Sequence, residues 1–380
     1  PDWSHADTAA VEMIEALANR DATFGESIDT AWSLTSAALH DRPDNIGPAL
    51  EAQSSHSDEP DPLASAINRP YSKALQTVFA LGWWEHRNTG QVRAECYMLL
   101  DEVIALPGWI GLEYRAVIAA RRLALEVFAR DWLETNQDEL FGELAPDSAG
   151  KATFELTLKW SPRTSVWFLG RFRNQLFAAG RRQAEHAISS MLVGCLWGVT
   201  GYEADTVLDA LRTEDPAPTA DAAEEMASLV QDADAGSDLL ETAVGFWQTI
   251  LDRFDRQLVP TASLLGLGRW VFVKSLDDRR FEELTLATVE RSVGAIDYVI
   301  EVADRLAESS PSVTSLNVLR MLLDAAHAEA WERDHVQSKA VEAARRATAE
   351  PDLATEVLRL RDRLLELGRH DARGIEPPSA

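Results

Sequence analysis

Apolar residues recur along most of the chain at the spacing of an amphipathic α-helix. Over residues 71–82 they follow the i, i+3, i+4, i+7 template, and residues 92–104 repeat it. Asn88-Thr89-Gly90 supplies a short turn between the two runs. Two helices with so short a connection predict an antiparallel helical hairpin.

The same period continues to the end of the chain. It predicts further helices over residues 112–133, 165–180, 185–198, 203–212, 239–258, 264–276, 284–309, 315–328, 336–349 and 353–367. The best strand candidate, residues 270–273, is too short and isolated to call for a sheet. We therefore predict an all-α protein of irregular antiparallel hairpins. Hairpins recur at roughly 40 residues, which fits a HEAT-like α-solenoid, and a multi-helical bundle is the alternative.

Two polar stretches predict linkers. Residues 53–69 are rich in Ser, Asp and Pro, and residues 213–222 combine acids with two prolines. The predicted organisation is an N-terminal helical arm (1–52), a linker (53–69), a central block (70–212), an acidic linker (213–222), a C-terminal block (223–370) and a tail (371–380). The acidic linker predicts a solvated loop, with a docking surface for a basic partner as the second interpretation.

Composition and charge narrow the class of protein. The 380 residues are 46% apolar, too many for a disordered chain, and the net charge of -26 argues against a duplex-DNA coat protein. Cys96 and Cys195 form no CxxC motif, which favours a reducing, cytoplasmic setting without disulfides. The first residues do not resemble a signal peptide, and the longest uncharged stretch, residues 187–202, is shorter than a membrane span.

Known catalytic motifs are missing from the sequence. There is no phosphate-binding GxxxxGK[ST] loop, no GxSxG and no HExxH, and Gly266-Leu267-Gly268 does not complete GxGxxG. The tightest group of metal-ligating types contains His327, Glu329, Glu332 and His335. Its two histidines lie about 80° apart around a helix and two turns distant, which favours a solvated helix end over a zinc site. We predict no catalytic, cofactor-binding or metal-binding residue.

A basic stretch interrupts this acidic sequence. No Asp or Glu lies over residues 161–184, where aromatic residues alternate with five arginines: Arg163, Arg171, Arg173, Arg181 and Arg182. We name these five the arginine set and take them as the candidate binding surface. They would bind phosphate or single-stranded nucleic acid, or else pair with acids of neighbouring helices while the aromatic residues form the core. Arg171 and Arg182 lie 11 residues apart, which predicts that they share one helical face.

Several segments resemble the C-terminal helical region of large bacterial antiphage defence proteins, which carry a STAND-type (NACHT-like) ATPase or a sirtuin-like NADase. The resemblance covers roughly residues 71–368 and consists of packing residues. They lie in the segments Phe128-Ala129-Arg130-Asp131-Trp132-Leu133, Glu139-Leu140-Phe141-Gly142, Leu267-Gly268-Arg269-Trp270-Val271-Phe272 and Val302-Ala303-Asp304-Arg305-Leu306. The resemblance implies a sensor region that recognises a phage protein, with upstream domains of a longer parent chain as further partners. It transfers no catalytic residue.

The first hypothesis is therefore a non-enzymatic helical module that binds another protein. The alternative is a nucleic-acid-binding or nucleotide-binding helical domain that uses the arginine set. An all-helical enzyme is the third, and it lacks clustered carboxylates: no DDxxD occurs, and Asp277-Asp278 is followed by two arginines, the wrong neighbours for holding magnesium.

Overall fold

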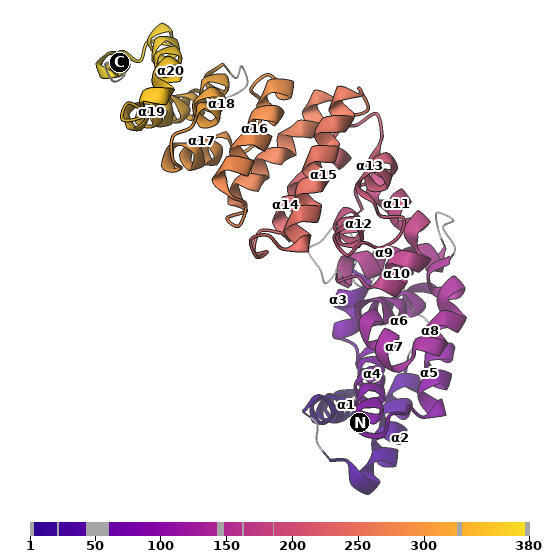
Figure 1. Cartoon of the computed structure of the whole chain (residues 1–380). Coiled ribbons are helices and arrows are strands. Elements are labelled where there is room, and N and C mark those ends of the chain that lie inside the picture. Colours follow the sequence, from indigo (N-terminus) through magenta and orange to yellow (C-terminus); the bar gives the residue numbers. More distant parts are fainter. Residues whose placement is uncertain are drawn as a thin grey trace. The chain divides into compact units, whose positions relative to one another are not determined.

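The computed structural model describes residues 4–20, 23–42, 61–142, 148–161, 163–184, 186–324 and 329–376. Throughout these ranges the regular secondary structure is helical, and no strand occurs in them (Figure 1). The predicted all-α class is confirmed. By its contacts the chain divides into two compact units, Pro1–Ser165 and Val166–Ala380. This division falls inside the predicted central block.

Unit 1 is built around α4, α6 and their neighbours. Its elements are α1 (Ser4–Asn19), α2 (Ile28–His40), α3 (Pro62–Ile67), α4 (Pro70–Thr89), α5 (Ala94–Ile104), α6 (Gly108–Ala120), α7 (Arg122–Phe128), α8 (Arg130–Gln137), a π-helical turn (Asp138–Gly142) and α9 (Ala149–Trp160). Helix α4 packs against α1 and α2, and α6 packs against α3 and α9. Pro70 begins α4 at its first turn, and Gly90 ends it in the left-handed conformation at φ 74°.

The predicted single helix over residues 112–133 is three helices. The breaks lie at Arg121 and Ala129, whose backbone angles leave the helical region. Neither a glycine nor a proline marks them. The short α7 instead brings the buried Phe128 ring onto Gly82 of α4, where a Cβ atom would lie 3.0 Å from the ring. Tertiary packing has overridden a continuous apolar pattern.

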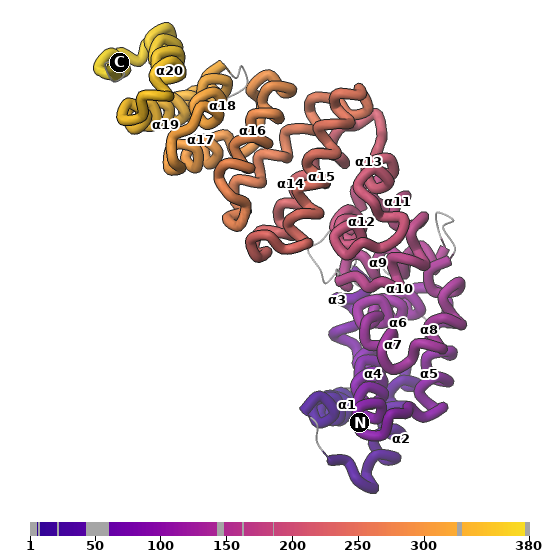
Figure 2. Tube along the Cα trace, in the orientation of Figure 1, coloured from indigo at the N-terminus to yellow at the C-terminus, as the bar shows by residue number. Residues whose placement is uncertain are grey.

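Unit 2 continues as helices stacked in chain order, which Figure 2 lets the reader follow by colour within the unit. Its main elements are α10 (Val166–Arg171), α11 (Arg173–Arg181), α12 (Ala187–Leu196), α13 (Ala204–Leu211), α14 (Ala217–Leu229), α15 (Asp238–Asp255), the 3-10 segment η4 (Thr261–Phe272), α16 (Asp278–Ser292), α17 (Val299–Glu308), α18 (Val313–Leu323), α19 (Ala330–Ala347) and α20 (Ala354–Glu366). Contacts join α12 to α14, α14 to η4, α16 to α18 and α17 to α19. Such near-neighbour stacking is typical of helical repeats.

Most of the segment predicted as a helix over 264–276 is the 3-10 segment η4, which also contains residues 270–272 of the strand candidate and ends before Val273. Its two glycines allow close backbone approach: a Cβ atom on Gly266 would lie 2.3 Å from the Ala220 carbonyl oxygen, and one on Gly268 1.8 Å from that of Asp297. Between them these glycines seat η4 against α14 and the loop before α17. The incomplete GxGxxG pattern therefore has a packing role.

Other predicted boundaries shift. The helix over 284–309 is interrupted at Val293, which adopts a left-handed φ of 56° and ends α16. The acidic linker over 213–222 contains the start of α14, where Pro218, Thr219 and Ala222 are buried. Of the linker over 53–69, residues 53–60 lie outside the described ranges and the remainder holds α3.

None of the described helices combines the length and the apolar character that crossing a bilayer requires.

Candidate functional site

Unit 1 has an open groove between α5 and α8, which we call the α5–α8 groove. Its volume is about 840 Å³. The α4–α5 turn contributes Gly90, Gln91 and Val92 to its lining. The remaining lining comes from α4, α5 and the segment 127–139: His86, Tyr97, Asp101, Ile104, Val127, Phe128, Ala129, Arg130, Asp131, Trp132, Thr135, Asn136 and Glu139.

Apolar side chains line the base of this groove and polar ones its rim. Phe128 and Trp132 are buried, whereas Asp101, Asp131 and Thr135 are exposed. The indole Nε1 of Trp132 donates a hydrogen bond of 2.6 Å to Asp101 Oδ1, which ties α8 to α5. An apolar base with a polar rim is the usual anatomy of a protein-binding surface.

Four residues with charged side chains line the groove, and two of them form ion pairs within the protein. Arg130 pairs with Glu134 at 2.6 Å, and Glu139 lies 3.6 Å from the buried Arg115. Asp101 and Asp131, in contrast, have no ion-pair partner within the ranges that the structure describes. The groove is therefore locally negative at Asp101 and Asp131.

The pKa of the Tyr97 hydroxyl reflects both its burial and this negative charge. Burial is the main cause that raises the pKa of its hydroxyl, and the nearby Cys96 and Asp131 raise it further. Its hydroxyl donates a long hydrogen bond of 3.4 Å to the Phe128 carbonyl oxygen. Tyr97 thus stays neutral between the α5 wall and the groove base.

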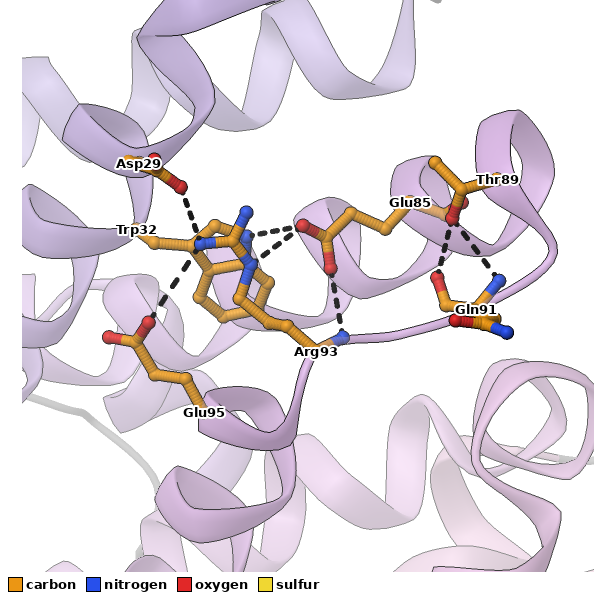
Figure 3. Close-up of polar contacts among 7 residues, drawn as sticks. All are labelled: Asp29, Trp32, Glu85, Thr89, Gln91, Arg93 and Glu95. Atoms are coloured by element: carbon orange, nitrogen blue, oxygen red, sulfur yellow. Dashed lines mark hydrogen bonds and ion pairs between the residues drawn. The ribbon is translucent and has the colours of Figure 1, made fainter.

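A buried carboxylate, Glu85, lies beside the α4–α5 turn, whose Gly90, Gln91 and Val92 line the groove (Figure 3). Glu85 Oε1 accepts hydrogen bonds from Trp32 Nε1 at 3.2 Å and from Arg93 Nε at 2.7 Å. Glu85 Oε2 accepts one from the Arg93 backbone N–H at 3.1 Å. The Arg93 guanidinium lies 5.2 Å from the Trp32 ring centroid and pairs with Asp29 at 3.1 Å. We call these four residues the Glu85 brace.

The brace joins α2, α4 and the residue just before α5, so it holds the α4–α5 turn from both sides. Within the turn, the Thr89 hydroxyl donates to the Glu85 carbonyl oxygen at 2.8 Å and accepts from the Gln91 N–H at 3.2 Å. Gly90 supplies the left-handed residue that closes the turn. This part of the groove lining is therefore a preformed backbone surface.

A second hollow of about 430 Å³ adjoins the groove and shares Val127 with it. Its apolar lining comes from Phe79, Ala80, Trp83 and Leu123. Val127 is 52% exposed and separates the two hollows as an apolar ridge. Glu15 lies at the second hollow, where burial raises the pKa of its carboxyl and Arg121, 3.7 Å away, opposes the shift.

The arginine set is distributed over both units. Arg163 belongs to unit 1, where its carbonyl oxygen accepts a 2.7 Å hydrogen bond from the buried Arg122, and the other four belong to unit 2. All five side chains are exposed. The expected shared helical face for Arg171 and Arg182 is wrong, because the helix breaks at Phe172 between α10 and α11.

Two members of the set support the fold of unit 2 directly. Arg181 Nη1 donates to the Ala210 carbonyl oxygen at 3.2 Å, near the C-terminal end of α13. Arg173 lies against Gly201, where a Cβ atom would be 2.0 Å from Nη1. Residues 173 and 181 stand at opposite ends of α11, roughly 12 Å apart. Phe168 and Phe172 are buried against each other, with ring centroids 5.1 Å apart, so these aromatic side chains form core.

The group suspected of metal binding is part of α19 and its approach. His327 lies outside the described residues. Glu329 and Glu332 form the capping box of α19, and His335 Nε2 lies 2.8 Å from Asp304 Oδ1. Over the described part of the chain, no three His, Cys, Asp or Glu residues are arranged to hold a metal ion.

The two cysteines are buried and unpaired. Burial raises the pKa of Cys96, and it raises the pKa of Cys195 to about 11. Neither thiol has the lowered pKa of a reactive nucleophile.

Reasoning from the sequence did not find the α5–α8 groove. Asp101 and Asp131 lie on different helices, and no spacing pattern in the sequence connects them, although Asp131 falls in the resemblance segment 128–133. The one signal that could have pointed to it is the density of aromatic residues in segment 128–141, which was interpreted as packing. Comparisons with protein-family models, with curated proteins and with solved structures find no match.

Proposed function

We propose that this protein is a non-enzymatic helical module that binds a segment of another protein in the α5–α8 groove. The observation that carries the proposal is the open form of the groove. Its rim residues on α5 and α8 are exposed, and the apolar ridge at Val127 leads into a second hollow. A small-molecule site encloses most of its ligand, whereas an open groove with an apolar base suits a peptide chain.

The role of an antiphage sensor is the more specific form of this proposal. It is supported by the resemblance to defence proteins. The first segment of that resemblance, residues 128–133, supplies Phe128 and Trp132 to the groove base and Asp131 to its rim. A sensor of this kind would bind a phage protein there and pass the event to other domains of its parent chain.

A variant that fills the groove tests the proposal. Thr135 is exposed on α8 and lines the groove, so Thr135→Trp should occupy the space without changing charge. Thr30 is exposed on α2 and lines neither hollow, so Thr30→Trp is the matched control. Proteins captured from lysates of phage-infected cells should be retained by the wild type and by Thr30→Trp, and lost with Thr135→Trp. Equal capture by all three would contradict the proposal.

The exposed unit 2 arginines keep nucleic-acid binding as a second candidate. It predicts that a fluorescent single-stranded oligonucleotide is retained at low salt and released by Arg171→Glu with Arg182→Glu. No retention at low salt would remove this candidate.

A further inference from the structure

We propose that the segment bound in the α5–α8 groove carries an arginine or lysine whose cation lies between Asp101 and Asp131, with apolar side chains beside it. This inference rests on the proposed function, because it names the chemistry of the protein segment bound there.

The charged residues of the groove favour a ligand that carries a cation. Asp101 on α5 and Asp131 on α8 both line the groove, are exposed and have no ion-pair partner in the described parts of the chain. The neighbouring charges, Arg130 and Glu139, are already paired within the protein. A bound segment without a cation would cover two unpaired carboxylates, and burying unpaired charge is unfavourable. A cation placed between them removes that cost.

The aromatic rings and apolar residues beside the two carboxylates favour the same kind of segment. Tyr97 and Trp132 line the groove next to the two carboxylates, and Trp132 is hydrogen-bonded to Asp101. Aromatic rings attract guanidinium and ammonium groups, and Arg also matches carboxylates with its fork of N–H donors. The exposed Val127 and the buried Ile104 and Phe128 offer contacts for apolar side chains at the same surface.

The length of the groove bounds the segment. Arg130 to Glu139 spans ten residues of helical backbone, or about 15 Å. An extended peptide covers that distance with roughly five residues. The groove therefore suits a short motif with one central cation rather than a long polybasic tract.

Selection from a displayed library of random 15-residue peptides tests the inference on the full chain. We expect wild-type protein to enrich peptides with one or two Arg or Lys flanked by apolar residues, and Thr135→Trp to lose them. Groove-dependent peptides without a basic residue would overturn the inference and leave the proposed function standing. No enrichment, or enrichment that Thr135→Trp does not reduce, would overturn both.

Charge variants then test where the cation binds. Asp131→Asn should lower the affinity for the best selected peptide at least tenfold, and this loss of affinity should be smaller at high salt. Glu26→Gln removes the same charge at an exposed site of unit 1 that lines neither hollow, and its affinity should stay within twofold of the wild type. Equal losses in both variants would mean attraction to the overall negative charge and would overturn the inference. Circular dichroism confirms that each variant is folded.

Discussion

The groove acids of unit 1 and the arginines of unit 2 are all exposed, but their charged side chains have different surroundings. Asp101 and Asp131 lie at the rim of a groove with an apolar base and have no ion-pair partner within the described residues. Arg173 and Arg181 are also exposed, but they lie against Gly201 and the end of α13. A charge run in the sequence is therefore a poor guide to a binding site. The shape around each charge and the backbone beneath it are more informative.

The largest expected effect concerns the support of the groove. Glu85→Ala removes the acceptor of the Trp32 indole N–H and the partner of the Arg93 guanidinium. Glu85 is buried, whereas the Arg93 side chain is 26% exposed and keeps Asp29 as a partner, so we expect the free energy of unfolding of unit 1 to fall by about 2 to 3 kcal/mol. Denaturant unfolding measures it. Because the α4–α5 turn loses this support, the variant should also bind the selected peptides more weakly.

Glu26→Ala serves as the matched control for this substitution, since Glu26 is exposed and should change the free energy of unfolding by less than about 0.5 kcal/mol. If Glu85→Ala is as stable as this control, the brace does not hold the α4–α5 turn.

The next effect concerns the fold role of Arg173. Gly201 has φ 87°, and a Cβ atom there would lie 2.0 Å from Arg173 Nη1. Gly201→Ala should therefore destabilise unit 2 by about 2 kcal/mol, through backbone strain and displacement of the guanidinium. Gly25→Ala has a similar positive φ of 53° with no atom within 4 Å, so it isolates the backbone contribution. Equal destabilisation by both would show that the contact with Arg173 contributes nothing.

The smallest effect compares two buried carboxylates. Glu85 faces a guanidinium, whereas Glu282 accepts hydrogen bonds from the hydroxyls of Ser309 and Ser312. Burial is the main cause that raises the pKa of Glu282. The folded state then binds a proton more tightly than the unfolded state does. The free energy of unfolding should fall as pH rises from the ordinary pKa of Glu through the raised one.

Glu282→Gln removes this dependence, and its amide oxygen keeps an acceptor for one of the two serine hydroxyls, while its amide N–H can donate to the oxygen of the other. The variant should gain stability relative to the wild type as pH rises, by less than about 1 kcal/mol at neutral pH. Denaturant unfolding across that pH range measures the difference. A gain that shrinks with rising pH would contradict the assigned direction.

The helical class could be predicted because the 3.6-residue period survives in nearly every element. The interruptions at Arg121, Ala129, Phe172 and Val293 could not, because no proline or glycine stands at these positions. The break at Ala129 accompanies the packing of Phe128 on Gly82, whereas the exposed Val293 is followed by Gly294, which has a positive φ of 83°. The 3-10 form of η4 depends on backbone that approaches its glycines from α14 and from Asp297.

The candidate site was less accessible to sequence reasoning than the fold. Arginines that lie close together in the chain predict one surface, and the structure places Arg173 and Arg181 at opposite ends of α11. The groove instead combines Gly90, Asp101 and Asp131 from three segments of unit 1. Residues that meet only through tertiary packing leave no spacing pattern in a single sequence.

Hydrogen–deuterium exchange of the full chain, with and without a selected basic peptide, tests the central claim most directly. We expect slower exchange in α5 (Ala94–Ile104) and α8 (Arg130–Gln137) on binding, with no change in α11 (Arg173–Arg181). Protection confined to α11, or spread evenly over the acidic surface, would contradict it.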